Sequence, residues 1–322
     1  MQIQTIGDVH LGRVFKTGVP LDRRGDREGE VWDTFKDQVR APGSDLKVIM
    51  GDLFDEFVVP PEVVIGAAMC LHEATAPVII LRGNHDASRN SEKMSSFDLL
   101  MALVGQNPNI QFAAGEAPLV QGGRAFFGWH PFVSAAEMAE KLPDDGSVTE
   151  VYGHWDTTLH TENDHNLIPL EIFARKGVQR VFTGHIHKAE RYRSHGLEVI
   201  VTGSMLPYAH GEQRPDDRTY LTLTPDEIEA ELAQDPDAFH WSNVRVLLPA
   251  GANYQKRFNC LSLTFKAQLG TDAEAEEDPD VDVQFDAFNF DHLAQHCFDK
   301  NNVPQDYRAE LLARLQEKNF HD

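Results

Sequence analysis

Cysteine is scarce in this chain, which has three cysteines among 322 residues. They are Cys70, Cys260 and Cys297, and no two of them stand at the Cys-x-x-Cys spacing. Such scattered cysteines support neither a disulfide framework nor a cysteine-ligated zinc site. The composition therefore favours a reducing compartment, and we expect a cytoplasmic protein.

Long apolar runs are also missing. No stretch reaches the roughly 18 consecutive apolar residues that a membrane-spanning helix needs, so we expect no membrane association. The chain starts MQIQTIGD, without the basic segment and apolar segment of a secretion signal. The sequence thus predicts a soluble protein that is not exported.

Positive charge is in short supply. The chain has 29 Lys and Arg residues against 51 Asp and Glu residues, a formal net charge of −22. Attraction of the whole molecule to nucleic acid or to an anionic membrane is therefore not expected, and a polyanion would have to be held by a local group of cations. Part of the acidity lies in residues 271–286, which contain eight acids and no base, as in a solvated linker.

The first half of the chain alternates short apolar runs with helix-like segments, which predicts an α/β domain with a mostly parallel sheet. The expected strands are 3–6, 46–50, 77–81, 125–127, 148–152, 178–183 and 197–202, and the expected helices are 28–39, 61–74 and 91–104. Alternating strands at 219–224, 244–248 and 260–265 indicate a smaller module. We divide the chain into a main domain (1–210), a smaller α+β capping module (211–269), an acidic linker (270–288) and a helical tail (289–322).

Five short segments place metal-ligand residue types at the ends of predicted strands. They are Asp8-Val9-His10, Gly51-Asp52-Leu53-Phe54-Asp55, Gly83-Asn84-His85-Asp86, Gly153-His154 and Gly184-His185-Ile186-His187. Strand ends in α/β sheets are where ligands bind, and a glycine before a ligand lets the backbone turn off its strand. Each segment alone is as typical of a tight turn, whereas all five in this order argue against coincidence.

The donor types also restrict the metal. Carboxylate, carboxamide and imidazole groups without thiolate suit manganese, iron or zinc better than copper(I) or an iron–sulfur cluster. Seven candidate ligands are too many for one ion and suit two ions that share a carboxylate, for which Asp52 is the best placed residue.

The ordered set Asp-x-His, Gly-Asp-x-x-Asp, Gly-Asn-His-Asp, His and Gly-His-x-His resembles the calcineurin-like metallophosphoesterases. The resemblance covers roughly residues 1–210 and implies an α/β fold, a four-layer αββα sandwich with two metals at its strand ends. The segments around Asp8, His154 and His187 also resemble the nuclease subunits of DNA-repair complexes, namely SbcD, the Mre-type nucleases and the recombination-nuclease subunit of T-even-like phages. The Gly-His-Trp segment and residues 207–218 are most similar to the phage branch. Beyond residue 211 the resemblance is loose.

Carried over position by position, the resemblance implies two divalent ions, manganese first and magnesium as the alternative. The ligands of one ion would be Asp8, His10, Asp52 and His187, and those of the other Asp52, Asn84, His154 and His185. His85 would position the phosphate or protonate the departing oxygen, and Asp55 would orient His85. Hydrolysis would proceed by in-line attack of a metal-activated water on phosphorus.

Cations gather in the loops that should border this site, where they are expected to contact DNA phosphates. They are Arg13, Lys16, Arg23, Arg24, Arg27, Arg89 and Lys188. The resemblance implies a manganese-dependent DNA exonuclease or endonuclease of recombination and repair, acting in the host cytoplasm if phage-encoded. Two alternatives stay open. One is a phosphoesterase for a nucleotide or cyclic nucleotide, and the other is a catalytically silent scaffold, which loss of a ligand or of His85 would have indicated.

Two partners follow from the same resemblance. Met94, Phe97, Met101 and Val104 recur at helical spacing where the resembling nucleases form homodimers, although packing into the core explains this pattern equally well. The tail carries two apolar stripes, Phe290 to Phe298 and Tyr307 to Leu315. Packing onto the main domain would account for them, and the resemblance favours docking on an SMC-like ABC ATPase of the SbcC type.

Overall fold

A computed structural model of the chain describes residues 1–87, 93–157, 165–213, 216–249, 252, 254–267 and 308. The chain separates into two compact units, Met1–Leu269 and Gly270–Asp322. Arg308 is the one described residue of the second unit, so the predicted linker, tail helices and ATPase contact lie outside the described residues, as does Arg89.

The first sheet is parallel and has four strands in chain order, β1 (Ile3–Ile6), β2 (Leu46–Ile49), β3 (Val78–Leu81) and β4 (Ile110–Ala113). Each pair of consecutive strands is joined by a crossover that contains one α-helix. These helices are α1 (Asp26–Arg40), α2 (Pro61–His72) and α3 (Ser96–Val104), and the short 3-10 helix η1 (Leu21–Arg23) precedes α1. Val31, Phe35 and Val39 stand one helical turn apart on α1 and are all buried, so this helix packs one apolar stripe onto the sheet.

The second sheet is mixed and has the strand order β5-β6-β7-β8-β10-β9. Its strands are β5 (Leu119–Gln121), β6 (Arg124–Phe126), β7 (Glu150–His154), β8 (Arg180–Gly184), β9 (Glu190–Ser194) and β10 (Leu197–Val201). The four central strands are parallel, and β5 and β9 are antiparallel edge strands. The helices α4 (Ala135–Glu140) and α5 (Leu170–Arg175) pack on its outer face through Met138 and Phe173.

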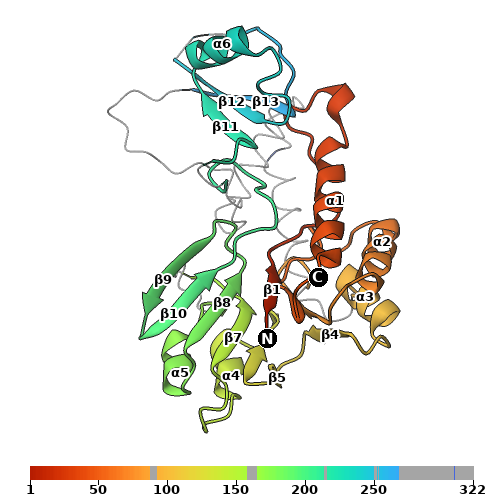
Figure 1. Ribbon diagram of the computed structural model, residues 1–322, viewed down its shortest axis with the longest axis vertical. Helices are drawn as coiled ribbons and strands as arrows, with labels where there is room; N and C mark the ends of the chain where they lie inside the picture. The colour runs from red at the N-terminus through yellow and green to blue at the C-terminus, as the bar shows by residue number, and fades with distance from the viewer. Residues whose placement is uncertain are drawn as a thin grey trace. The chain divides into compact units, whose positions relative to one another are not determined.

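The two sheets face each other across a shared apolar layer. Val48 and Ile79 of the first sheet belong to one buried cluster with Phe126 and Tyr152 of the second. The rings of Tyr152 and Phe182 stack at 4.6 Å between centroids, which fills the space between the sheets with aromatic surface. Helices, sheet, sheet and helices thus form four layers, with α1 to α3 and α4 to α5 on opposite sides (Figure 1), and the α/β sandwich prediction is confirmed.

The described part of the second module is built on a third, parallel sheet of β11 (Tyr220–Leu223), β12 (Asn243–Leu248) and β13 (Ser262–Ala267). Parallel neighbours need a crossover, and α6 (Pro225–Gln234) supplies the one between β11 and β12. This helix was not anticipated, although Thr224 and Glu227 form a capping box and Pro225 occupies its first turn.

The proposed dimer stripe lies mainly in the core. Phe97 and Val104 of α3 are fully buried against the first sheet, and Met101 packs on the same cluster, whereas Met94 is exposed. The helical spacing therefore reflects core packing at these positions, and the homodimer stays a prediction. None of the helices in the described part of the chain has the length and apolar character that crossing a bilayer requires.

A candidate two-metal centre

The seven predicted ligands come from the carboxyl ends of five strands. Asp8 and His10 follow β1, Asp52 follows β2 and Asn84 follows β3, while His154 ends β7 and His185 and His187 follow β8. Because β1 to β3 and β7 to β8 are parallel within their sheets, these ends lie at the same edge of each sheet. The fold brings the separate motifs together at this edge.

The sharp turns are made by three of the candidate ligands and by Gly51, which precedes Asp52 and has φ of 106°. His10, Asp52 and His185 have φ of 51°, 45° and 73°, in the left-handed region that non-glycine residues rarely adopt. Such strain, of order 1–3 kcal/mol per residue, persists where the surroundings fix the conformation, as they do at functional sites. Two neighbouring glycines provide space instead: a Cβ on Gly83 would lie 2.0 Å from Asp52 Oδ1, and one on Gly184 would lie 2.7 Å from Asp8 Oδ1.

The first cluster consists of Asp8, His10 and His187, whose ligand atoms lie within 4.8 Å of one another. The Nε2 atoms of the two histidines are 3.1 Å apart, and His187 Nε2 is 3.6 Å from Asp8 Oδ2. Both carboxylate oxygens of Asp8 are buried without a hydrogen-bond partner among the described residues. A divalent cation would fit here, since it would satisfy buried carboxylate oxygens that otherwise lack a partner and would bind the two imidazole nitrogens beside them.

The second cluster consists of Asp52, His154 and His185, again within 4.8 Å. His154 Nε2 lies 3.3 Å from Asp52 Oδ2 and 3.2 Å from His185 Nδ1. Asn84 joins this cluster, with its Oδ1 2.9 Å from His154 Nε2. The structure thus places Asn84 as predicted, and it groups the Asp52 carboxylate with the second cluster, so that bridging by Asp52 stays a prediction.

Each ligand histidine is held by a second contact on the ring nitrogen that points away from its cluster. His10 Nδ1 lies 3.2 Å from Asp55 Oδ1, and His154 Nδ1 is 2.9 Å from the carbonyl oxygen of Met50. The remaining two contacts join His185 Nε2 to Asp156 Oδ1 at 2.8 Å and His187 Nδ1 to Glu212 Oε1 at 3.0 Å. Such partners fix the tautomer and the ring orientation of a metal-binding histidine. Asp156 and Glu212 were missed by sequence reasoning because neither belongs to a ligand motif.

His85 lies beside the first cluster without being part of it. Its ring centroid is 5.0 Å from that of His10, edge to face. Its Nδ1 donates to the backbone carbonyl of Asp55 at 2.6 Å, which leaves Nε2 for a substrate. The contact of Asp55 with His85 is thus made by its backbone, while its carboxylate faces His10 and Arg13, and orientation of His85 by Asp55 stays a prediction.

Asp86 ties two of the ligand loops together. Its buried carboxylate accepts hydrogen bonds from the backbone N–H groups of Leu53, Phe54 and Gly83 at 3.3, 3.0 and 2.9 Å. The first two donors follow Asp52 and the third precedes Asn84, so one side chain fixes the spacing between ligands from β2 and β3. Asp86 belongs to the Gly83–Asp86 motif, but its role was not apparent from the sequence, because two of its three hydrogen-bond donors lie in the loop after β2.

The electrostatics of the buried ligands favour an added positive charge. Burial raises the pKa of Asp8, against the opposing effect of the histidines around it. Burial also opposes ionisation of Asp52 and of His154, but their mutual attraction prevails, so the pKa of Asp52 falls and that of His154 rises to about 10. Without a cation the site recruits protons to balance its carboxylates, and a divalent ion would replace those protons.

The predicted DNA-binding cations divide into two groups. Arg13, Lys16, Arg24 and Lys188 are exposed or half-exposed. Arg23 and Arg27 are 9% and 2% exposed: Arg23 donates to Asp26 and Asn259, and Arg27 donates to the carbonyl of Pro207. These two guanidinium groups are used inside the protein, so we correct the expectation and leave them out of the DNA-contacting set.

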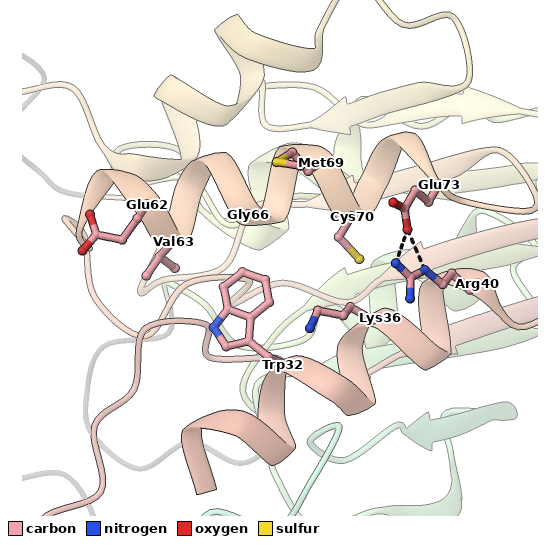
Figure 2. A pocket seen from close by; sticks show the side chains of 9 residues that line it. All are labelled: Trp32, Lys36, Arg40, Glu62, Val63, Gly66, Met69, Cys70 and Glu73. Carbon is pink, nitrogen blue, oxygen red and sulfur yellow. Dashed lines mark hydrogen bonds and ion pairs between the residues drawn. The ribbon is translucent and has the colours of Figure 1, made fainter. Parts of the chain in front are cut away.

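A separate cavity of about 400 Å³ lies between α1 and α2 (Figure 2). Trp32 covers Gly66, where a Cβ would lie 3.0 Å from the indole ring, and the ion pair of Arg40 with Glu73 lines the cavity farther along the two helices. None of its lining residues is a predicted metal ligand. The chemistry of the chain is therefore placed at the strand ends and not in this cavity.

Comparison with known proteins gives the family of this chain. The model of the calcineurin-like phosphoesterase family matches residues 1–189. A comparison with curated proteins found no match. Structural similarity extends to the protein TT1561 of Thermus thermophilus (13% identity, 63% of this chain and 89% of that one, TM-score 0.44). It also extends to a phosphopantetheinyl hydrolase of Mycobacterium tuberculosis, with 12% identity, 68% of this chain and 98% of that one covered, and a TM-score of 0.42. A single mutant of Vps29 from Entamoeba histolytica has 15% identity, 65% of this chain and 78% of that one covered, and a TM-score of 0.29.

The matching family model indicates a metal-dependent hydrolase, and an α/β sandwich with seven candidate oxygen and nitrogen ligands at its strand ends agrees with that class. The chain belongs to the calcineurin-like phosphoesterase family, whose members bind two divalent metals. The described part of the chain has two candidate ligand clusters, which could hold those two metals. The family is thus established.

Proposed function

We propose that this protein is a manganese-dependent DNA exonuclease or endonuclease, the nuclease subunit of an SbcCD-like or Mre-type recombination and repair complex. The observation that carries the proposal is His85, an imidazole that is no ligand, lies next to the first cluster and is oriented by the Asp55 carbonyl. Exposed cations on the loop after β1 and on the loop after β8 support a polyanionic substrate. The resemblance to repair nucleases at the ligand motifs supports the same conclusion.

The chemistry assigned to each residue follows from its position. Two divalent ions, when bound, supply Lewis acidity and activate water for attack on a phosphodiester. His10, His154, His185 and His187 would hold the ions together with Asp8, Asp52 and Asn84. Since Nδ1–H of His85 is donated to the Asp55 carbonyl, its Nε2 would hold a phosphate oxygen or deliver a proton to the departing oxygen from the imidazolium form, in which Nε2 also carries a proton.

Arg13, Lys16, Arg24 and Lys188 are proposed to contact DNA phosphates, together with Arg89. Each removed phosphate contact lowers the slope of log affinity against log salt by about 0.9 for duplex DNA. Neutralising Lys16, Arg24 and Lys188 together should therefore flatten the salt dependence measurably in a fluorescence-anisotropy titration. The matched control is Arg23→Gln, whose buried side chain should leave the slope unchanged. A triple variant with the slope of the unmodified protein removes these side chains from the interface.

The test of the activity compares plasmid, linear duplex and single-stranded DNA as substrates, with manganese against magnesium. Degradation with manganese supports the proposal. The alternative, a phosphoesterase for nucleotides or cyclic nucleotides, shares every metal ligand and predicts hydrolysis of those compounds while DNA stays intact.

His85→Ala should keep both metals and lose most turnover, and full activity in that variant contradicts the role of His85. Asp52→Ala should lose metal at both sites if Asp52 bridges, and two ions found by elemental analysis refute the bridge.

The partners proposed are DNA, a second copy of the chain and an SMC-like ABC ATPase. The ATPase contact is assigned to the apolar stripes of residues 289–322. Truncation before Thr271 should keep manganese-dependent activity on single-stranded DNA and abolish association with the ATPase. A truncated protein that still co-purifies with the ATPase at the original stoichiometry shows that the tail does not make the ATPase contact.

The homodimer is tested by light scattering at high protein concentration, where a monomer alone decides against it.

A further inference from the structure

The segment after β10 passes directly beside the first metal cluster. Ser204 forms an isolated parallel bridge with Asp8, and its N–H donates to the carbonyl of His187 at 3.0 Å. Met205 N–H donates to the carbonyl of Asp8 at 3.0 Å. The backbones of two ligand residues are therefore bonded to the chain that leads into the second module.

Glu212 stands at the start of that module, and its carboxylate is fully used. One oxygen accepts from His187 Nδ1 at 3.0 Å, and the other accepts from the backbone N–H groups of Tyr208 and Ala209 at 2.6 and 3.1 Å. Glu212 is 19% exposed, so these bonds are shielded in part from water. The carboxylate fixes the tautomer of His187 and leaves Nε2 facing Asp8 and His10.

The same loop is bonded to the third sheet. The hydroxyl of Tyr220, the first residue of β11, donates to the carbonyl of Tyr208 at 2.7 Å. Gln213 Nε2 donates to the carbonyl of Tyr220 at 3.1 Å, and the guanidinium of Arg27 lies 5.6 Å from the Tyr220 ring. A continuous set of contacts thus leads from β11 through Tyr208 and Glu212 to His187.

We propose that Glu212 is a positioning residue for His187 and that the second module, through the contact of Tyr220 with the Tyr208–Glu212 loop, controls metal occupancy of the first cluster. This inference rests on the proposed metal centre and does not depend on the identity of the phosphodiester. The second cluster has its own support, the contact of His185 with Asp156, so the effect is confined to one of two sites.

The test is calorimetric titration of the full chain with Mn²⁺ alone. Glu212→Gln keeps the size of the side chain but cannot accept from all three donors, and Glu212→Ala removes all three bonds. Both should weaken one Mn²⁺ site by about 10- to 100-fold and leave the other unchanged, as is typical when the partner of a ligand histidine is removed. Tyr220→Phe, which touches no ligand, should weaken the same site by roughly 2- to 10-fold, the effect of one hydrogen bond. The control is Glu190→Gln, an exposed glutamate three residues after His187.

Electron paramagnetic resonance gives a readout that a general loss of stability would not move. At saturation of the tighter site, the Glu212 variants should show isolated Mn²⁺ where the unmodified chain shows coupled pairs. Unchanged affinity at both sites in Glu212→Ala overturns the inference, and so does equal weakening of both sites together with a lower melting temperature in EDTA. Unchanged Mn²⁺ affinity in Tyr220→Phe overturns the inference that the second module influences metal occupancy. A chain that binds two Mn²⁺ and leaves DNA intact contradicts the nuclease proposal alone.

Discussion

Replacing Asp86 tests whether the ligand loops after β2 and β3 are held together by one carboxylate. Asp86→Ala leaves three buried N–H donors without a partner, and each orphaned buried donor costs about 1–3 kcal/mol. The sum is at least about 3 kcal/mol, a large part of the 5–15 kcal/mol that stabilises a typical domain. Asp86→Asn keeps one accepting oxygen, which at the Oδ2 position serves Leu53 and Gly83, so it should cost about 1–3 kcal/mol.

The assay is urea unfolding in EDTA, which isolates the loops from bound metal, followed by Mn²⁺ titration of the folded variants. Because Asp86 sets the distance between Asp52 and Asn84, Asp86→Asn should also weaken Mn²⁺ binding at the second cluster by about 10- to 100-fold. Asp22→Ala, at an exposed aspartate of η1, is the control and should change neither quantity. An Asp86→Ala protein within 1 kcal/mol of the unmodified one would refute the reasoning, since three buried donors cannot lose their acceptor at so small a cost.

Four further predictions concern the metal centre and the buried thiols. Manganese at about 1,000 times its dissociation constant should stabilise the fold by ~4 kcal/mol per site, and calorimetry should show a higher melting temperature than in EDTA; identical temperatures would contradict a metal centre in the folded state. Gly83→Ala should abolish binding at the second cluster, because the added Cβ would lie 2.0 Å from Asp52 Oδ1, and Mn²⁺ titration with Gly115→Ala as the open-space control measures this. Burial raises the pKa of Cys70 and of Cys260 to about 11, so both thiols should resist iodoacetamide at pH 8 and react in urea, as peptide mass spectrometry would reveal. Because their folded pKa lies above the unfolded value, the same thiols should lower stability only as pH rises past about 9.

The strands that carry ligands were predictable because their sequences are short apolar runs followed by ligand residues. The edge strands were not. Leu119–Gln121 has three residues, and Glu190–Ser194 reads ERYRS, with no apolar alternation. The second of these forms because the turn at His195 and Gly196, both with positive φ, folds it back onto β10. A strand that depends on its neighbour leaves no pattern of its own.

The site shows the same division between local and distant information. The candidate ligands could be found because each lies within a short, recognisable motif. Asp156 and Glu212 lie 29 and 25 residues from the histidines that they contact, so no local motif contains them. The burial of Arg23 was equally hidden, since its acceptor Asn259 is 236 residues away. A basic residue beside a metal motif looks the same in sequence whether it faces DNA or an internal partner.

The wide separation of the ligands along the chain has a consequence for how the protein is made. His10 and His187 meet across 177 residues, and the second cluster needs loops from both sheets. Bringing together residues so far apart in the chain costs conformational entropy, which makes such contacts form slowly. We therefore expect the clusters to assemble after both sheets have formed and come together. Synthesis of nearly three fifths of the chain precedes the first complete site, and before that point the nascent chain offers metals only part of each ligand set. A complete ligand set therefore exists only once both sheets have come together, so the choice among competing metals would be made by a folded site rather than by an unfolded chain.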